Sequence, residues 1–179
     1  MARVWMGKNF YKKLFEEENR LVEEKEKTIY QLKHYAELVR YIASFSPMQQ
    51  LISIVPYSSY HGEETYIVFF TKRTPGHFSH TIYGYRMDNL RDWVYRAYVD
   101  IHSSDQKAEL IDHYSRPTRK GIGTLGVLAI RNLLLSHGCT RLYGKMAAEC
   151  LADRKELVAF YQKNGFEISG EYIQLHLSP

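Results

Sequence analysis

The segment that is most informative about the fold reads Arg116-Pro117-Thr118-Arg119-Lys120-Gly121-Ile122-Gly123-Thr124. A β-branched and aromatic run precedes it and an apolar helical pattern follows it, so it joins a strand to the start of a helix. Helix N-termini offer free amide donors and a positive dipole, and glycine lets the backbone approach a ligand closely. The segment predicts either a phosphate-binding loop or an ordinary strand-to-helix turn. It is neither a Walker loop nor a three-glycine dinucleotide loop.

The segments around this loop alternate between strand and helix patterns. After Pro47, β-branched and aromatic runs predict an antiparallel meander with strands at Leu51–Val55, Thr65–Phe70, Thr81–Tyr85, Val94–Ile101 and Leu110–Tyr114. There follow a helix to about His137, a strand at Arg141–Ala147, a helix at Asp153–Lys163 and one or two closing strands within Phe166–Leu177. Because a helix crosses between neighbouring strands, at least one pair must be parallel. We therefore predict an α/β (α+β) fold with a mixed, mostly antiparallel sheet flanked by helices.

The first part of the chain has a different sequence pattern. No Gly or Pro occurs between Asn9 and Phe45, which predicts one long helix, or two with a break, and an N-terminal extension (1–46) before the main domain (47–179). Apolar residues recur at helical spacing in its second half, at Ile29, Leu32, Tyr35, Ala36, Val39, Ile42 and Ala43. Such a helix would measure about 55 Å. It would fold back on the core or form a coiled coil, including a homodimer.

Composition excludes several classes of protein. The 45% apolar content is that of a globular chain, and a net charge of +4 is too small and dispersed to indicate nucleic-acid binding. No run approaches the ~18 apolar residues of a membrane span, and the N-terminus lacks a secretory signal, so we expect a cytoplasmic protein. Cys139 and Cys150 have no metal-ligand or disulfide-framework spacing, so we expect reduced thiols and no metal.

A second segment makes the interpretation of this loop more specific. It reads Leu157-Val158-Ala159-Phe160-Tyr161-Gln162-Lys163-Asn164-Gly165-Phe166. Together the two segments resemble the acyl-CoA-binding loop and the C-terminal helix of the GCN5-related N-acetyltransferase (GNAT) superfamily. The resemblance covers residues 48–177 in element order, with recognisable motifs in 111–170. It implies an acetyltransferase that moves an acetyl group from its cosubstrate acetyl-CoA to an amine acceptor.

The resemblance also implies roles for individual residues. The loop, with Arg119, Lys120, Gly121, Ile122, Gly123 and Thr124, would bind the CoA pyrophosphate, and the strand residues Ile111, Asp112, His113 and Tyr114 would pair with pantetheine. Tyr161 would lie near the thioester sulfur. Two positions depart from the family pattern. Thr118 stands where Arg or Gln is usual, and Arg154, kept here as a candidate CoA contact, replaces a frequent Asn.

The reaction needs a group that takes a proton from the acceptor and one that protonates the departing thiolate. Tyr161 is the expected donor, since a phenol is close in acidity to a thiol, although it could also be a packed aromatic residue. Simple alternation places Glu109, Ile111 and His113 on one strand face, and Leu110, Asp112 and Tyr114 on the other. Family members often carry a glutamate base on this strand, so Glu109 is the preferred base, with His113 or ordered water as alternatives.

The acceptor has no recognisable motif in the sequence. Small amines, antibiotics, protein lysines or N-termini, and aminoacyl-tRNA all stay open. A second functional hypothesis is a catalytically idle domain of the same fold, which would bind acyl-CoA or a protein partner through the N-terminal helix.

Overall fold

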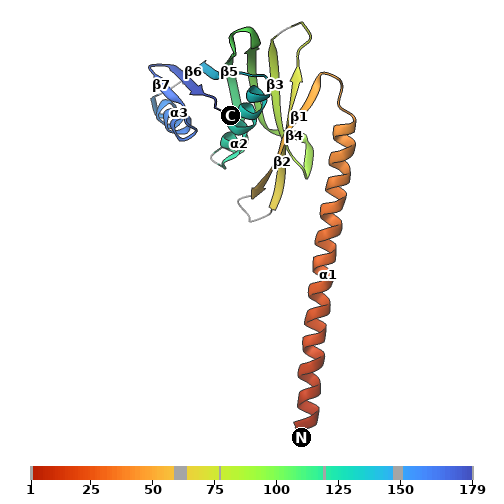
Figure 1. The fold of residues 1–179 in the computed structure, drawn as a ribbon. Helices are drawn as coiled ribbons and strands as arrows, with labels where there is room; N and C mark the ends of the chain where they lie inside the picture. The colour runs from red at the N-terminus through yellow and green to blue at the C-terminus, as the bar shows by residue number, and fades with distance from the viewer. Residues whose placement is uncertain (1, 59–63, 77, 119, 147–150, 179) are drawn as a thin grey trace. The chain divides into compact units, whose positions relative to one another are not determined.

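The computed structural model describes residues 2–58, 64–76, 78–118, 120–146 and 151–178. It divides the chain into two compact units, Met1–Ala43 and Ser44–Pro179. The first unit consists of α1 (Ala2–Ala43), which Figure 1 shows as one uninterrupted helix. Of the two arrangements that the sequence allowed here, the single long helix is the one observed, and it begins before Asn9.

The second unit is built on an eight-stranded sheet with the order β1-β2-β3-β4-β5-β6-β8-β7. Its strands are β1 (Gln49–Ser58), β2 (Glu64–Arg73), β3 (Ser79–Arg86), β4 (Asn89–His102), β5 (Lys107–Ser115), β6 (Arg141–Lys145), β7 (Glu167–Ser169) and β8 (Tyr172–His176). Neighbouring strands are antiparallel except β5 and β6, which are parallel. The predicted mixed, mostly antiparallel sheet is thus confirmed.

Two helices connect the C-terminal strands. The parallel connection is made by α2 (Ile122–Ser136), and α3 (Leu151–Lys163) links β6 to β7. Strands β1 to β5 follow one another with no α-helix between them in the described residues, and only the short 3-10 turn η1 (Ser103–Asp105) separates β4 from β5. The predicted meander is therefore confirmed.

The core lies between the sheet and these two helices. Its largest fully buried side chains include Tyr95, Phe69 and Ile82 from the sheet and Ile130 and Leu133 from α2. A Cβ on Gly126 of α2 would lie only 2.2 Å from the Tyr95 ring, so glycine is needed where this helix crosses β4. This close approach holds the N-terminal end of α2 against the strands that form the site.

The described residues also bear on two absences expected from the sequence. None of their helices contains an apolar stretch long enough to cross a bilayer. Within these residues there is also no group of three or more His, Cys, Asp or Glu side chains placed to hold a metal ion. Cys139 is a buried free thiol, and Cys150 lies outside the described residues.

Candidate active site

The site lies where β5 and β6 separate. The two strands pair from Lys107 and Arg141 to Leu110 and Gly144, after which β6 ends while β5 continues to Ser115. A Cβ on Gly144 would lie 2.6 Å from the Leu110 carbonyl oxygen, so the strands are in close contact at the branch point. Beyond it, residues 112–115 pair with β4 on one edge, and residues 111–115 pair with no other described strand. Free backbone groups on such an edge can pair with an extended, amide-containing ligand.

A β-bulge at the start of this free segment changes which side chains face the helices. Tyr98 pairs with Asp112 but the next residue of β4, Val99, pairs with Leu110, so Ile111 is the extra residue. A bulge of one residue reverses the alternation of side chains beyond it. Leu110 and His113 therefore point to the same, helix-covered side. The alternation predicted from the sequence is wrong, because Glu109 and His113 lie on opposite faces of the sheet.

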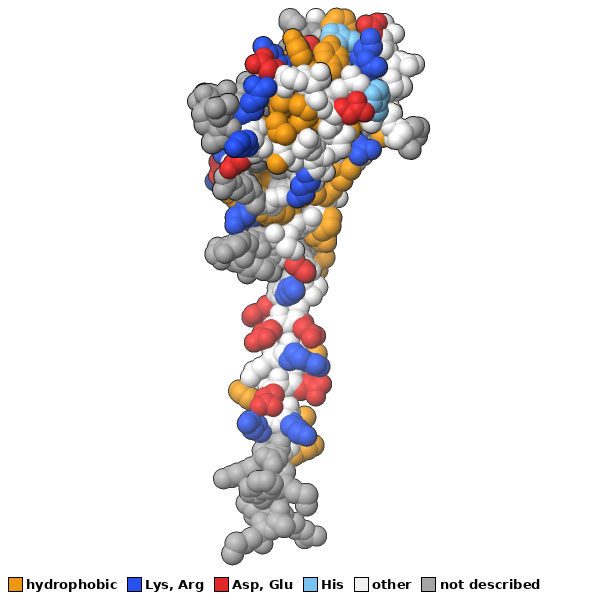
Figure 2. Space-filling view, turned by 90° about the vertical axis from the view of Figure 1, so that its left-hand side faces the viewer, with side chains coloured by type: hydrophobic (Ala, Val, Ile, Leu, Met, Phe, Trp, Pro, Cys, Tyr) orange, Lys and Arg blue, Asp and Glu red, His pale blue; other side chains and the backbone are white. Residues whose placement is uncertain are grey.

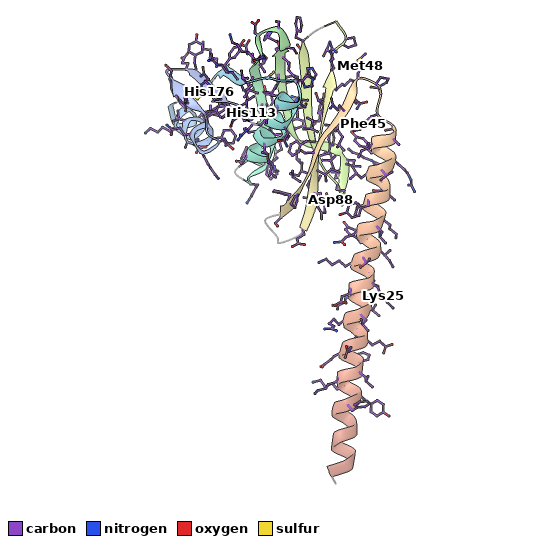
Figure 3. All side chains as sticks on the ribbon, in the orientation of Figure 1. Lys25, Phe45, Met48, Asp88, His113 and His176 are labelled. Carbon is purple, nitrogen blue, oxygen red and sulfur yellow. The ribbon has the colours of Figure 1, made fainter. Side chains whose placement is uncertain are left out.

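His113 is the centre of a cluster of aromatic side chains. Its Nε2 lies 3.0 Å from the Tyr161 hydroxyl, and its ring stacks on Phe160 with centroids 5.3 Å apart. Its Nδ1 is buried and has no hydrogen-bond partner in the described part of the chain. Burial lowers the pKa of His113, and the nearby Asp112 carboxylate opposes this only in part. The imidazole is therefore neutral near pH 7 and able to accept a proton. Figure 3 labels His113 on β5.

The two tyrosines around His113, Tyr161 and Tyr95, keep their hydroxyl protons at neutral pH. Burial, and to a smaller extent the Asp112 charge, raises the pKa of Tyr161 to about 12. Burial also raises the pKa of Tyr95, whose hydroxyl has no hydrogen-bond partner among the described residues. The cluster is therefore uncharged at neutral pH, and its proton positions depend on the tautomer of His113.

A cavity of about 690 Å³ lies against this cluster. One wall is the free half of β5 and the residues after it, and the other wall is α3; the lining residues are His113, Tyr114, Ser115, Arg116, Thr118, Asp153, Glu156, Leu157, Ala159 and Phe160. Tyr161 is buried behind this wall and is not among the described lining residues. His113 is therefore the member of the pair that the cavity reaches.

The N-terminus of α2 adjoins the same region. Gly121 is its N-cap, with φ of 78°, and makes no side-chain cap hydrogen bond. The amides that begin α2 are thus free of a capping side chain and can bind an anion. Gly123 has a second role: a Cβ there would lie 3.0 Å from Phe160 Cε2, so glycine lets α2 and α3 touch. Arg119 lies outside the described residues.

Comparison with known proteins finds the same kind of fold. No protein-family model and no curated sequence matches the chain. Among solved structures it is similar to a GNAT-family protein from Desulfovibrio desulfuricans (TM-score 0.49, 12% identity, covering 56% of this chain and 69% of that one). It is also similar to Tetrahymena GCN5 (0.47, 11%, 57% and 70%) and to the PaiA N-acetyltransferase of Thermoplasma acidophilum in complex with coenzyme A (0.43, 19%, 54% and 59%).

The fold is of the GNAT type. At these identities and TM-scores the likeness describes the fold alone, so the roles of individual residues depend on the geometry of this chain. In that geometry, β5 continues beyond the end of its pairing with β6, and the start of α2 approaches α3 at Gly123 and Phe160.

The structure brings together only some of the residues expected at a GNAT active site. His113 and Tyr161 lie together, and Tyr114 lines the same cavity as His113. The start of α2 is close by, with Lys120, Gly121, Ile122, Gly123 and Thr124. Ile111 is the bulge residue. The Asp112 carboxylate accepts hydrogen bonds from the Tyr114 hydroxyl and, at 2.7 Å, from the His113 amide.

Two expected residues lie elsewhere. Glu109 is on the opposite face of the sheet, where Tyr143 Oη donates to it at 3.5 Å, and it does not line the cavity in the described structure. Arg154 donates to the carbonyl of Gly170, at 3.2 Å. The acidic pair Asp153 and Glu156, which the sequence reasoning missed, instead lines the α3 wall.

Sequence reasoning also missed a cluster of arginine and aromatic side chains. The guanidinium of Arg96 lies 4.7 Å from the centre of the Trp93 ring and 5.4 Å from the rings of Tyr98 and Tyr114, and that of Arg116 lies 4.4 Å from the Trp93 ring. Across β4 and β5, Arg96 pairs with Tyr114 and Tyr98 pairs with Asp112. The Ala97–His113 pair lies between these two pairs, so its side chains point to the other face of the sheet. The cluster is therefore on the face opposite His113. Within β4, only Arg96 and Tyr98, two residues apart, share a face by simple alternation, so the sequence offered little signal for this cluster.

Proposed function

We propose that this protein is an acetyl-CoA-dependent N-acetyltransferase that transfers an acetyl group to an amine. The observation that carries the proposal is the free edge of β5 at residues 111–115, which adjoins a cavity with His113 on its wall and the uncapped N-terminus of α2 nearby. An extended chain with amides, a pyrophosphate and a thioester needs these three features in one place.

Each part of the site suits one part of acetyl-CoA. The free backbone groups of β5 would pair with the amides of pantetheine. The amides that begin α2 would hold the pyrophosphate, and the Lys120 side chain, next to Gly121, adds positive charge. The thioester would then lie towards the branch between β5 and β6, near His113 and Phe160 of the cavity wall.

His113 is the residue placed to move a proton. The amine nitrogen attacks the thioester carbonyl carbon, the C–N bond forms, the C–S bond breaks, and the proton lost by nitrogen goes to the neutral imidazole. The thiolate sulfur then takes up that proton from the imidazolium, directly or through water, which completes the products, an amide and CoA, and returns His113 to its neutral form. We do not assign this step to Glu109, because it lies on the opposite face of the sheet.

Tyr161 acts through His113 in this scheme. Its hydroxyl is engaged with Nε2, and a pKa raised to about 12 makes it a poorer donor to a thiolate than an unperturbed phenol. Its hydrogen bond holds the imidazole in one orientation. We therefore assign Tyr161 as a positioning residue, which modifies the direct donor role expected from the family.

Arg116 favours an acceptor that carries an anionic group. Its guanidinium lies 4.4 Å from the centre of the Trp93 ring, and the residue lines the cavity. A guanidinium group held beside an indole attracts a carboxylate or phosphate. Amines with such a group should have lower KM values than matched neutral amines, and Arg116→Gln should remove the difference.

The activity is tested by measuring thiol release from acetyl-CoA across a panel of amines, with and without carboxylate or phosphate groups. Release above the rate of spontaneous hydrolysis with at least one acceptor supports the proposal. If CoA binds in calorimetry but no amine stimulates release, the alternative applies, and the protein is a catalytically idle acyl-CoA-binding domain.

A further inference from the structure

A row of exposed side chains runs along α1 at alternating steps of four and three residues. It consists of Tyr11, Phe15, Glu18, Val22, Lys25, Ile29, Leu32, Ala36 and Val39. All but Glu18 and Lys25 are apolar, and the exposed fractions reach 73% at Tyr11 and 65% at Val39. The mean step of 3.5 residues is that of a coiled-coil seam.

The first unit does not bury this seam, because that unit consists of the single helix α1. Every member of the row is exposed on that helix. The ion pairs of α1, such as Arg20 with Glu17 and with Glu24, are solvent-exposed and add little stability. A helix of 42 residues with a continuous exposed apolar seam gains most of its stability by packing that seam against a partner.

The two charged members of the seam indicate which partner fits. Glu18 and Lys25 are one heptad apart and opposite in sign. In a parallel, in-register pair, Glu18 would face Glu18 and Lys25 would face Lys25, which is unfavourable in both layers. In an antiparallel pair centred near Val22, Glu18 of each helix lies beside Lys25 of the other. The same chain supplies both complementary charges.

We propose that α1 forms an antiparallel two-helix coiled coil with α1 of a second copy of this chain. Val22 is also close to the middle of Ala2–Ala43, so the alignment that pairs the charges overlaps the full helices, about 63 Å at 1.5 Å per residue. Lys25 lies midway along α1 (Figure 3). Figure 2 shows acidic and basic side chains spread along the visible surface of α1, which suits solvent-exposed helix faces beside a narrow apolar seam.

The oligomeric state tests the seam. Light scattering coupled to size exclusion should give twice the chain mass of 21.1 kDa for the full-length protein. Ile29→Asp, in the seam, should give a monomer, whereas Tyr30→Asp, its exposed neighbour outside the seam, should stay a dimer. A monomeric parent protein, or equal loss of the dimer in both variants, overturns the proposal. Thiol release is a separate readout, so failure here leaves the acetyltransferase proposal intact.

The orientation is tested by reversing charges. Glu18→Lys and Lys25→Glu alone each place like charges side by side in the antiparallel pair and should raise the dimer dissociation constant at least tenfold. The double variant restores both pairs and should recover the parent value. In a parallel pair each single variant still has like charges facing each other, so unchanged dimerisation in both single variants overturns the antiparallel assignment.

Discussion

The two halves of β5 differ in their neighbours, and this difference separates structural from chemical roles. Residues 107–110 are paired on both edges, and Glu109 there shares a hydrogen bond with Tyr143. Residues 111–115 have one free edge, and His113 there reaches a cavity. Glutamate is as suitable a base as histidine in general. In this strand, pairing and the bulge at Ile111 decide which of the two meets a ligand.

The strongest test of this comparison replaces His113 and Glu109 by glutamine, one residue at a time. His113→Gln keeps a side chain of similar length and removes the proton acceptor, so kcat should fall about 10²- to 10⁴-fold. Glu109→Gln, its matched control on the paired half, should stay within about threefold of the parent, because its partner Tyr143 can still donate to the amide oxygen. Steady-state thiol release with a saturating acceptor measures both.

The result would be reversed if the sequence-based preference for Glu109 were right. A large loss in Glu109→Gln with near-normal His113→Gln would show that the paired half carries the base. Melting temperatures of both variants check that neither loss reflects unfolding.

The second test moves from the strand to the two ends of α2. Gly121 and Gly138 both have positive φ, 78° and 72°, and a Cβ on either meets no atom within 4 Å. Alanine should therefore cost about 1 kcal/mol of strain at each end and lower both melting temperatures alike. Only Gly121→Ala should weaken CoA, by about tenfold, since disturbing one charge-assisted amide contact costs about 1.5 kcal/mol.

Calorimetric CoA binding and thermal melts decide this test. Equal CoA affinity in the two variants would mean that the CoA phosphates do not bind at the N-terminus of α2. Gly123→Val is a harsher change, expected to abolish CoA binding. Its added Cβ also meets Phe160, so its effect on binding has to be read together with its melting temperature.

The sequence predicted the elements whose signals are local. Gly121, Gly123 and the flanking patterns are enough to place a strand, a turn and a helix, and a helix between strands requires the parallel β5–β6 pair. The bulge at Ile111 could not be predicted in this way, since it depends on how β5 pairs with β4. The same holds for the hydrogen bond between His113 and Tyr161, which only the folded chain brings together.

The surface features were harder to see for a different reason. The arginine cluster combines residues of two strands and the segment after β5, and it has no sequence motif of its own. The seam of α1 was recognised only in its second half, because Glu18 and Lys25 interrupt the apolar pattern of the first. Polar residues within a seam obscure its apolar heptad repeat in the sequence. The same residues help to determine which helix can pair with the seam.

A smaller effect is expected at Tyr161. Tyr161→Phe keeps the ring and its contacts and removes the hydrogen bond to His113, so kcat should fall about tenfold, less than for His113→Gln. As a positioning residue it should also alter the pH dependence of kcat, because the tautomer and pKa of His113 depend on its partner. CoA affinity should be unchanged. A loss above about 10²-fold with an unchanged pH profile would restore Tyr161 as the direct proton donor.

The smallest expected effect is on stability against pH, and it compares His113 with His80, a buried histidine of β3. Burial, and to a smaller extent the charges of His137 and Arg73, lowers the pKa of His80 to about 4. The Asp100 charge opposes this shift. Its Nδ1 lies 3.2 Å from Thr71 Oγ1. Burial also lowers the pKa of His113, against the charge of Asp112.

For both histidines the folded state binds a proton less readily than the unfolded state, whose pKa is about 6.5. Their contribution to stability is therefore fully present above pH 6.5 and is lost as the pH falls from there towards the lowered pKa values. The melting temperature should fall by several degrees between pH 7 and pH 4.5, and His80→Gln and His113→Gln should each reduce the slope. CoA bound as proposed would cover the cavity of His113 but not His80. Saturating CoA should then alter the slope in the parent and in His80→Gln, and it should leave the slope of His113→Gln unchanged. An equal response to CoA in both variants would mean that CoA does not lie on the free half of β5.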